Sequence, residues 1–154
     1  MATVHGYYSG EDDAALKARV AQLGLEDHVA WLNQVSIRKA FPAYQSSLLC
    51  VLPYMGSFAG LAAATAAAAG VPVIGSRNAG IPEHLGENAI WIKDDNAEEI
   101  AAQIEKLLAS AELRRDLSRR VRLRAEQHLS WETIADNTLA VYHRALKHKG
   151  HARA

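Results

Sequence analysis

The residues best placed for chemistry lie in a short loop with glycines at 56 and 60 and a serine at 57. Glycine lets a backbone approach a ligand closely, and its small size opens conformations that other residues avoid. The loop precedes a segment that is predicted to be helical. Because the first N–H groups of a helix are free and its dipole is positive there, this pattern indicates a site for an anionic group such as a phosphate.

The elements on either side of this loop predict a strand-loop-helix-strand unit. Residues 48–53 form a short apolar run, as expected of a strand buried in a parallel sheet. Residues 61–69 contain seven alanines, the strongest helix former, and Gly70 follows as a C-cap. Residues 71–74 supply the next strand. In an open α/β sheet, ligands bind at the carboxyl ends of such strands.

The rest of the chain continues the alternation of strands and helices. The apolar periodicity predicts strands at 3–8, 28–32 and 89–92, a turn or short helix at 81–85, and helices at 11–23, 36–44, 97–108, 112–128 and 131–147, with a kink or break at Pro42. This order predicts an α/β fold with a Rossmann-like, doubly wound parallel sheet. We expect one domain over residues 1–148 and a disordered tail at 149–154.

Composition narrows the functional classes. The 154 residues are 49% hydrophobic, enough for one core, and carry 17 basic and 17 acidic side chains. A net charge of zero gives no overall field that would favour nucleic acid. The lone cysteine, Cys50, has no partner for an internal disulfide, and we expect a cytoplasmic protein without a signal or membrane span.

Several motifs in consistent order resemble one family. The shared positions are Pro53, Gly60, Leu61, Ala66, Gly70, Pro72, Val73, Pro82 and Glu83, with similar segments at 29–35 (VAWLNQV), 86–95 (GENAIWIKDD) and 129–132 (LSWE). This spacing resembles the nucleotide-sugar-binding half of retaining glycosyltransferases of the GT-B fold, family 4, also called glycosyl transferases group 1. The likeness covers roughly residues 20 to 146, and ordered motifs are more specific than any one alone.

The resemblance implies a function and a set of contacts. The donor would be a UDP- or GDP-linked sugar, with no cofactor and no metal, and the acceptor would be held by a missing domain, a partner chain or a homo-oligomer. Membrane contact would be at most peripheral. No catalytic residue is assigned, and the substrate-binding residues would be Gly56, Ser57, Phe58, Ala59, Gly60, Leu61, Thr65, Arg77 and Glu83.

The chain also departs from the family pattern. The family places two glutamates eight positions apart, one on the donor sugar and one on the ribose, where this chain has Ser57 and Thr65. A hydroxyl cannot make the bidentate, charge-assisted contacts of a carboxylate, so donor binding should be weaker. The resemblance further implies that this sequence begins after the family's first strand-helix unit, which carries a cation for the leaving diphosphate.

Each polar candidate has a structural alternative. Ser57 would be an N-cap if the helix began at 58 or 59, and Thr65 could bond a carbonyl one turn earlier. Glu83 could cap the next short helix. Arg77 could pair with Glu83 or Glu87 on the surface instead of supplying charge to a ligand.

The arginine-rich segment has two possible interpretations, and so does the function of the whole chain. Residues 114–124 (RRDLSRRVRLR) form either a solvated helix surface or a patch for anionic lipid. The whole chain is either a donor-binding domain or subunit of a glycosyltransferase, or a degenerate binding or interaction module without catalysis. A nucleotide-sugar epimerase is a third option, although its acid and base carboxylates are not found.

Overall fold

A computed structural model describes residues 2–6, 10–33, 35–53, 60–78, 80–93 and 96–151. The predicted contacts of Gly56, Ser57, Phe58 and Ala59 therefore lie outside the described residues. The chain divides into two compact units, Met1–Ser46 and Ser47–Ala154. Each unit is described by itself.

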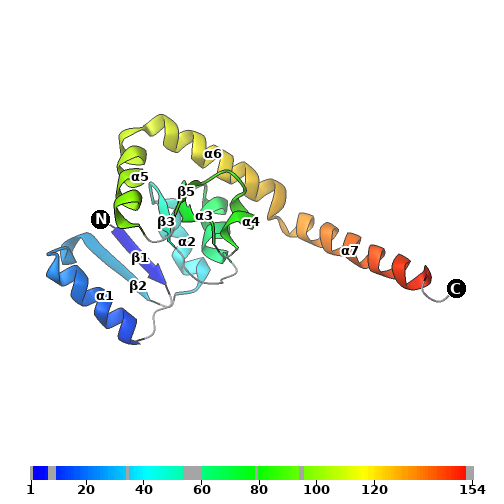
Figure 1. The fold of residues 1–154 in the computed structure, drawn as a ribbon, viewed down its shortest axis with the longest axis horizontal. Helices are drawn as coiled ribbons and strands as arrows, with labels where there is room; N and C mark the ends of the chain where they lie inside the picture. The colour runs from blue at the N-terminus through cyan, green and yellow to red at the C-terminus, as the bar shows by residue number, and fades with distance from the viewer. Residues whose placement is uncertain are drawn as a thin grey trace. The chain divides into compact units, whose positions relative to one another are not determined.

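The first unit contains two parallel strands and their helices (Figure 1). The elements are strand β1 (Ala2–Gly6), helix α1 (Gly10–Gln22), the 3-10 helix η1 (Glu26–His28), strand β2 (Val29–Asn33) and helix α2 (Ile37–Gln45). Ala2 pairs with Val29 and Gly6 with Asn33. Every predicted element of this region is present, with ends that differ by one or two residues.

Helix α2 runs through Pro42 to Gln45, so the predicted break does not occur. Proline has no N–H group, so the carbonyl one turn earlier, at Arg38, loses its usual partner. Both residues are exposed, and water can hydrate that carbonyl. Exposure on this face explains why the helix continues.

The second unit is built on a three-stranded parallel sheet of order β3-β4-β5. Its elements are β3 (Cys50–Leu52), α3 (Leu61–Ala69), β4 (Val73–Ser76), α4 (Ile81–Leu85), β5 (Ile90–Ile92), α5 (Ala97–Ala109), α6 (Ala111–His128) and α7 (Trp131–His151). All strand pairs in both units are parallel, as predicted. Helix α7 extends to His151, beyond the predicted end near residue 147.

Strand β4 begins two residues later than the sequence predicts. The N–H of Val71 donates to Ala66 O at 2.9 Å and that of Gly70 to Ala67 O at 3.0 Å, which closes the carboxyl end of α3. The carbonyl of Pro72 then accepts from Cys50 N at 2.8 Å. Val71 therefore completes the helix cap, the carbonyl of Pro72 bonds the neighbouring strand, and regular pairing starts at Val73.

The core of this unit lies where the sheet meets α5 and α6. Ile74, Ile92, Leu107 and Leu117 form a buried cluster. In α3 the alanines at 63, 66 and 67 are fully buried, since small side chains let the helix pack closely against its neighbours. The alanine run thus serves packing as well as helix formation.

The arginines of α6 satisfy the carboxyl ends of three neighbouring helices. Arg122 donates to Ala68 O of α3, Arg124 to Glu83 O of α4 at 3.0 Å, and Arg114 to Leu108 O of α5 at 2.7 Å. Cations at these ends bond the last carbonyls and offset the negative end of the helix dipole. The arginine-rich segment therefore has a structural role that the sequence did not predict.

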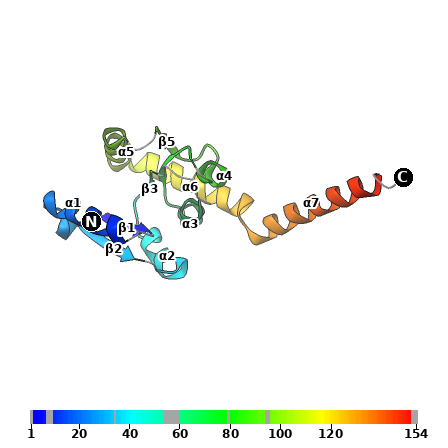
Figure 2. The ribbon, with the colours of Figure 1, turned by 60° about the horizontal axis from the view of Figure 1, so that its bottom comes forward.

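Helix α7 continues beyond the end of α6 in Figures 1 and 2. Its large apolar side chains are exposed, with Trp131 82%, Tyr142 61% and Leu146 67% accessible. Among the described residues, no helix has the length and apolar character needed to cross a bilayer.

Candidate functional site

The site candidate lies at the carboxyl edge of the β3-β4-β5 sheet. Leu52 pairs with Gly75, and Gly75 with Trp91, so the three strands end at the same edge. Helix α3 follows β3 from this edge, and α4 follows β4. The starts of both helices are therefore brought to the place where open α/β sheets bind ligands.

Gly60 holds the starts of these two helices in close contact. It is buried and has φ of 71°, a left-handed conformation that favours glycine. A Cβ atom at this position would lie 2.7 Å from the Gly80 carbonyl carbon and 2.8 Å from His84 Cδ2. Only glycine fits, because the backbone of residue 80 and the imidazole occupy the space that a side chain would need.

The N-cap residue of α3 is a glycine and offers no capping side chain. Gly60 is the N-cap residue, its carbonyl accepts from Ala63 N at 2.9 Å and Ala64 N at 3.1 Å, and the first turn contains no acidic residue. The N–H groups of Leu61 and Ala62 have no partner within the helix, as at every helix start. This end can therefore donate hydrogen bonds to an anion from outside.

The structure corrects one alternative for Ser57. Helix α3 begins at Leu61, so the proposed start at 58 or 59, which would have made Ser57 the N-cap, is wrong. The side chain of Leu61 is 59% exposed. Leu61 therefore does not belong to the buried core.

The hydroxyl of Thr65 makes the hydrogen bond within its own helix that was predicted as the structural alternative to a ribose contact. Its hydroxyl donates to Leu61 O at 2.8 Å, one turn earlier, and the residue is only 7% exposed. The hydroxyl oxygen keeps lone pairs that can accept a bond, but its proton is already used. Its contact with a ribose stays a prediction.

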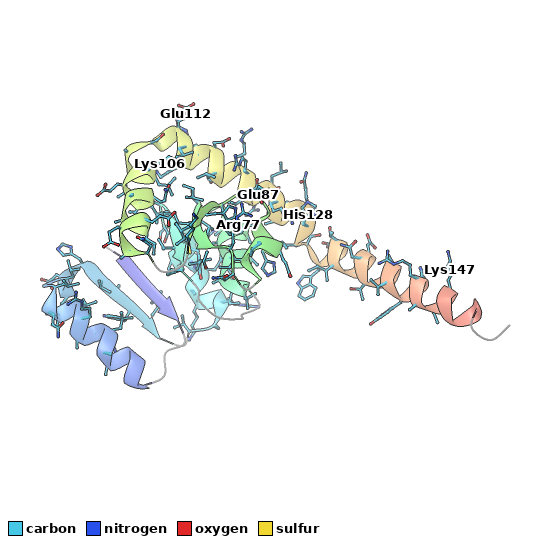
Figure 3. All side chains as sticks on the ribbon, viewed as in Figure 1. Arg77, Glu87, Lys106, Glu112, His128 and Lys147 are labelled. Carbon is cyan, nitrogen blue, oxygen red and sulfur yellow. The ribbon has the colours of Figure 1, made fainter. Side chains whose placement is uncertain are left out.

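Arg77 pairs with Glu87, one of its two predicted surface partners (Figure 3). Nη1 and Nη2 lie 3.0 Å and 2.6 Å from the two carboxylate oxygens, and the guanidinium lies 4.7 Å from the centre of the Trp91 ring. Hydrogen bonding from Arg77 lowers the pKa of Glu87 below its ordinary value. The guanidinium is thus held on the surface by a carboxylate and an aromatic face.

Glu83 and His84 differ in their position in α4. Glu83 is exposed in the first turn, while its backbone carbonyl accepts from Arg124. His84 is half-buried against Gly60, a contact that the sequence analysis missed. The sequence signal that could have identified His84 is its position directly after Pro82 and Glu83. The structure thus adds Gly80 and His84 to the candidate site.

The single cysteine, Cys50, is not a nucleophile at neutral pH. Burial raises the pKa of the Cys50 thiol to about 12, so it stays protonated at neutral pH. Among the described residues, no three His, Cys, Asp or Glu side chains converge as metal ligands would. The site candidate therefore consists of backbone donors and the side chains around them.

Comparison with known proteins agrees with this architecture. Residues 2–124 match the family model described as glycosyl transferases group 1. The chain is 29% identical over 152 residues to D-inositol 3-phosphate glycosyltransferase from Pseudarthrobacter chlorophenolicus, covering 97% of this chain and 36% of that protein.

Two solved structures share the fold. Sucrose-phosphate synthase from Thermosynechococcus elongatus matches with a TM-score of 0.82 and 24% identity, over 94% of this chain and 38% of that one. Anabaena HepE, solved in complex with UDP-glucose, matches with a TM-score of 0.81 and 16% identity, over 94% and 41%. The fold is the Rossmann-like domain of GT-B glycosyltransferases.

The chain belongs to the glycosyl transferases group 1 family, because the family model matches most of its length. It corresponds to the C-terminal domain of such enzymes. The chain spans about a third of the length of the curated relatives that it matches.

Proposed function

We propose that this chain binds a nucleotide-diphosphate sugar at the carboxyl edge of the β3-β4-β5 sheet, as the donor-binding part of a retaining glycosyltransferase. The observation that carries the proposal is the start of α3. Its N-cap residue, Gly60, offers no capping side chain and lies directly against Gly80. A diphosphate supplies the negative charge that this end favours.

The chemistry follows from where charge develops. In retaining transfer, the acceptor hydroxyl attacks the anomeric carbon while the bond to the diphosphate breaks. The departing diphosphate gains negative charge, and the N–H groups of Leu61 and Ala62 would stabilise it without a metal ion. Such preorganised donors are usually the largest single contribution to catalysis in sites of this kind.

The acceptor would be held by a part outside this sequence or by a partner chain. The relatives extend well beyond the matched region, which supports this proposal. Helix α7 also supports it, since Trp131, Tyr142 and Leu146 form an exposed apolar stripe while Glu132 and Asp136 lie on the polar side. A second copy of the chain is the alternative occupant, and light scattering that finds a stable dimer would favour it.

The test is a titration with UDP, GDP, ADP and their glucose or mannose conjugates, in which the unfolding temperature is measured at each ligand concentration. A ligand that binds only the folded state stabilises it by about 2.7 kcal/mol at a hundredfold excess over Kd. We expect one nucleotide to raise the unfolding temperature and thereby to identify the base.

A pair of glycine variants at the two ends of α3 makes the control specific. Gly60→Ala fills the contact with Gly80, whereas Gly70→Ala changes a glycine of similar φ, 72°, with neighbours no closer than 3.5 Å. We expect Gly70→Ala to keep the ligand-induced shift and Gly60→Ala to lose it.

A second outcome would favour the degenerate module. The family resemblance places two glutamates where this chain has Ser57 and Thr65, and hydroxyls at these positions would support that alternative. If no nucleotide shifts the unfolding temperature at millimolar concentration, the donor-binding proposal fails for this chain.

A further inference from the structure

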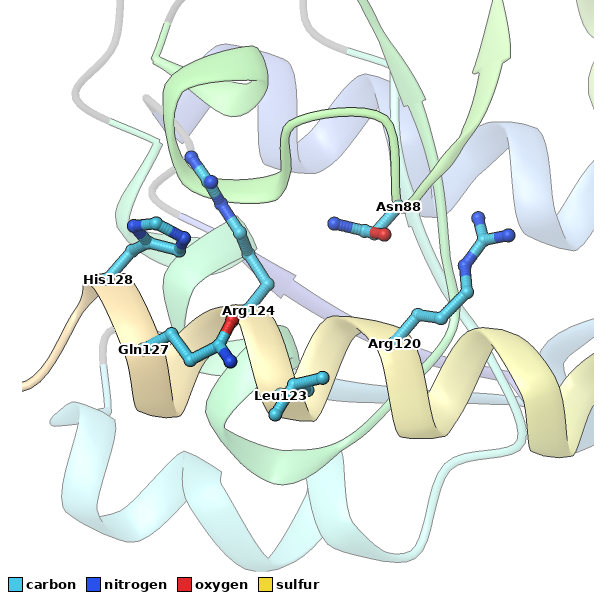
Figure 4. A pocket seen from close by; sticks show the side chains of 6 residues that line it. All are labelled: Asn88, Arg120, Leu123, Arg124, Gln127 and His128. Atoms are coloured by element: carbon cyan, nitrogen blue, oxygen red, sulfur yellow. The ribbon is translucent and has the colours of Figure 1, made fainter.

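A pocket of about 200 Å³ lies between α6 and the segment that joins α4 to β5 (Figure 4). Its lining residues are Asn88, Arg120, Leu123, Arg124, Gln127 and His128. The five from α6 are spaced three, four, seven and eight residues apart, so they share one face of the helix. None of them belongs to the donor site proposed above.

The pocket is lined by two guanidinium groups and no carboxylate. Among the residues that the structure describes, Arg120 pairs with one acid, Asp116 at 3.6 Å, which it shares with Arg119 at 2.8 Å. In the same part of the chain, Arg124 donates its hydrogen bonds to backbone carbonyls. The positive charge on this face is therefore only partly compensated.

Arg124 is held in place before any ligand arrives. Its Nε and Nη2 donate to His84 O at 3.3 Å and Glu83 O at 3.0 Å, which leaves Nη1 without a partner in these bonds. A Cβ at Gly86 would lie 3.6 Å from Arg124 Cζ, an ordinary van der Waals distance, so the guanidinium lies next to the turn that follows α4. A fixed guanidinium loses less freedom when it binds.

Arg120 and Asn88 are oriented by backbone contacts as well. Arg120 Nη2 donates to Glu87 O at 3.2 Å, and Asn88 Nδ2 donates to Leu85 O at 2.9 Å. Each group keeps further N–H donors, because a guanidinium has five and an amide two. Two elements therefore present oriented donors to the same small space.

We propose that this pocket binds a phosphate group, held by Arg120 and Arg124 with the amides of Asn88 and Gln127. Arginine matches phosphate through paired, charge-assisted hydrogen bonds. At about 200 Å³ the pocket is below the usual range for sites that enclose whole ligands. Its size therefore suits a phosphate group, carried by a small molecule or by a lipid headgroup.

The test is an NMR titration of the full chain with inorganic phosphate and with glycerol 3-phosphate. It follows the Nε–H signals of Arg120 and Arg124 and the side-chain amides of Asn88 and Gln127. We expect saturable shifts at these four groups. Loss of one charged hydrogen-bond donor should weaken binding by about tenfold.

Arg120→Gln is the test variant, and Arg119→Gln is its matched control. Both remove one charge from adjacent positions of α6 that contact Asp116, but only Arg120 lines the pocket. We expect Arg120→Gln to weaken phosphate binding while Arg119→Gln leaves it nearly unchanged. Arg124→Lys, which keeps the charge but loses the planar fork, should also weaken it, with thermal unfolding as the check on folding.

Vesicles of phosphatidylcholine, with or without phosphatidate, distinguish the phosphate of a lipid headgroup from that of a soluble molecule. Sedimentation with the phosphatidate vesicles alone, lost in Arg120→Gln, would assign a lipid headgroup. Binding of glycerol 3-phosphate without sedimentation would assign a soluble phosphate. Absence of saturable shifts, or equal weakening by Arg119→Gln and Arg120→Gln, would overturn the proposal.

Discussion

Helices α3 and α5 both start at the carboxyl edge of the same sheet, yet their first turns differ. In α5 the side chain of Asn96 accepts from Glu99 N at 2.8 Å, and Glu98 and Glu99 place negative charge in the first turn. In α3 the N-cap is Gly60, without a side chain to accept, and the first turn has no acid.

This difference shows which helix start is available to a ligand. In α5 a side chain accepts from Glu99 N and two carboxylates lie in the first turn, and Glu99 also accepts from Lys93 N at 3.1 Å. The first turn of α3 has neither feature, which favours an anion from outside. The same sheet edge thus contains one closed helix start and one open one.

The largest expected effect comes from closing the open start with a methyl group. Gly60→Ala adds a left-handed alanine and a clash with the Gly80 backbone, so we expect it to lower the free energy of unfolding by about 3 kcal/mol. Gly70→Ala, with the same strain but ordinary contacts, should cost about 1 kcal/mol. Urea unfolding measures both, and equal losses would show that the contact with Gly80 is not tight.

Giving α3 the acidic first turn of α5 should close its start electrostatically. We expect Leu61→Glu, at an exposed position, to stabilise the unliganded chain by about 0.5 kcal/mol and to weaken binding of the stabilising nucleotide about tenfold. Leu61→Gln is the uncharged control. Isothermal titration checks the affinities, and an unchanged affinity in Leu61→Glu would place the ligand elsewhere.

Removing the side-chain cap of α5 tests whether this helix start has any part in nucleotide binding. Asn96→Ala removes the acceptor for Glu99 N and should lower stability by about 1 kcal/mol. Asn96→Asp keeps the acceptor and should cost much less. Nucleotide affinity should not change in either variant, and a change measured in the same titration would contradict the assignment of the site to α3.

Thr65 tests how much of α3 contributes to binding. Thr65→Val keeps the shape but loses the bond to Leu61 O, and a stability loss of about 0.5–1 kcal/mol is expected without a change in nucleotide affinity. Thr65→Ser is the control that keeps the hydroxyl. A lower affinity in the valine variant, with stability unchanged, would instead assign the hydroxyl to the ribose.

The smallest effect concerns the acid near α4. Glu87 has its pKa lowered from an ordinary 4.5 by Arg77, so its stabilising contribution is present above that value and is lost as pH falls through the lower, folded-state pKa. Glu87→Gln should remove this part of the acid dependence. Thermal unfolding between pH 6 and acid pH measures it, and identical profiles would show that the exposed pair contributes nothing.

Much of the fold could be predicted because its signals are local. The alanine run of α3, the glycine at 70 and the short apolar runs at 50–52 and 90–92 depend on neighbours in the sequence. The start of β4 was misplaced by two residues, since the bond from Val71 N to Ala66 O belongs to a cap that propensity does not reveal. Local patterns therefore predict that an element exists better than where it begins.

The candidate site was predicted less completely. Motif spacing singled out Gly60 and Leu61 as candidates, and the bond of Thr65 and the pairing of Arg77 with Glu87 matched stated alternatives. The contact of His84 with Gly60 was missed, because it joins residues more than twenty positions apart. Spacing along the chain does not show which side chain fills the space beside a glycine.

By itself, the sequence determined the class of protein, since ordered glycine, proline and apolar positions predict a parallel α/β sheet with a helix start at its edge. Only the tertiary structure decided which charged side chains bond to which helix ends. It brings arginines of α6 to the carboxyl ends of α3, α4 and α5, and it places a glycine instead of a capping side chain at the start of α3. The physical reason is that hydrogen bonds and charge pairs act over a few ångströms in space, and folding alone brings those distant residues together.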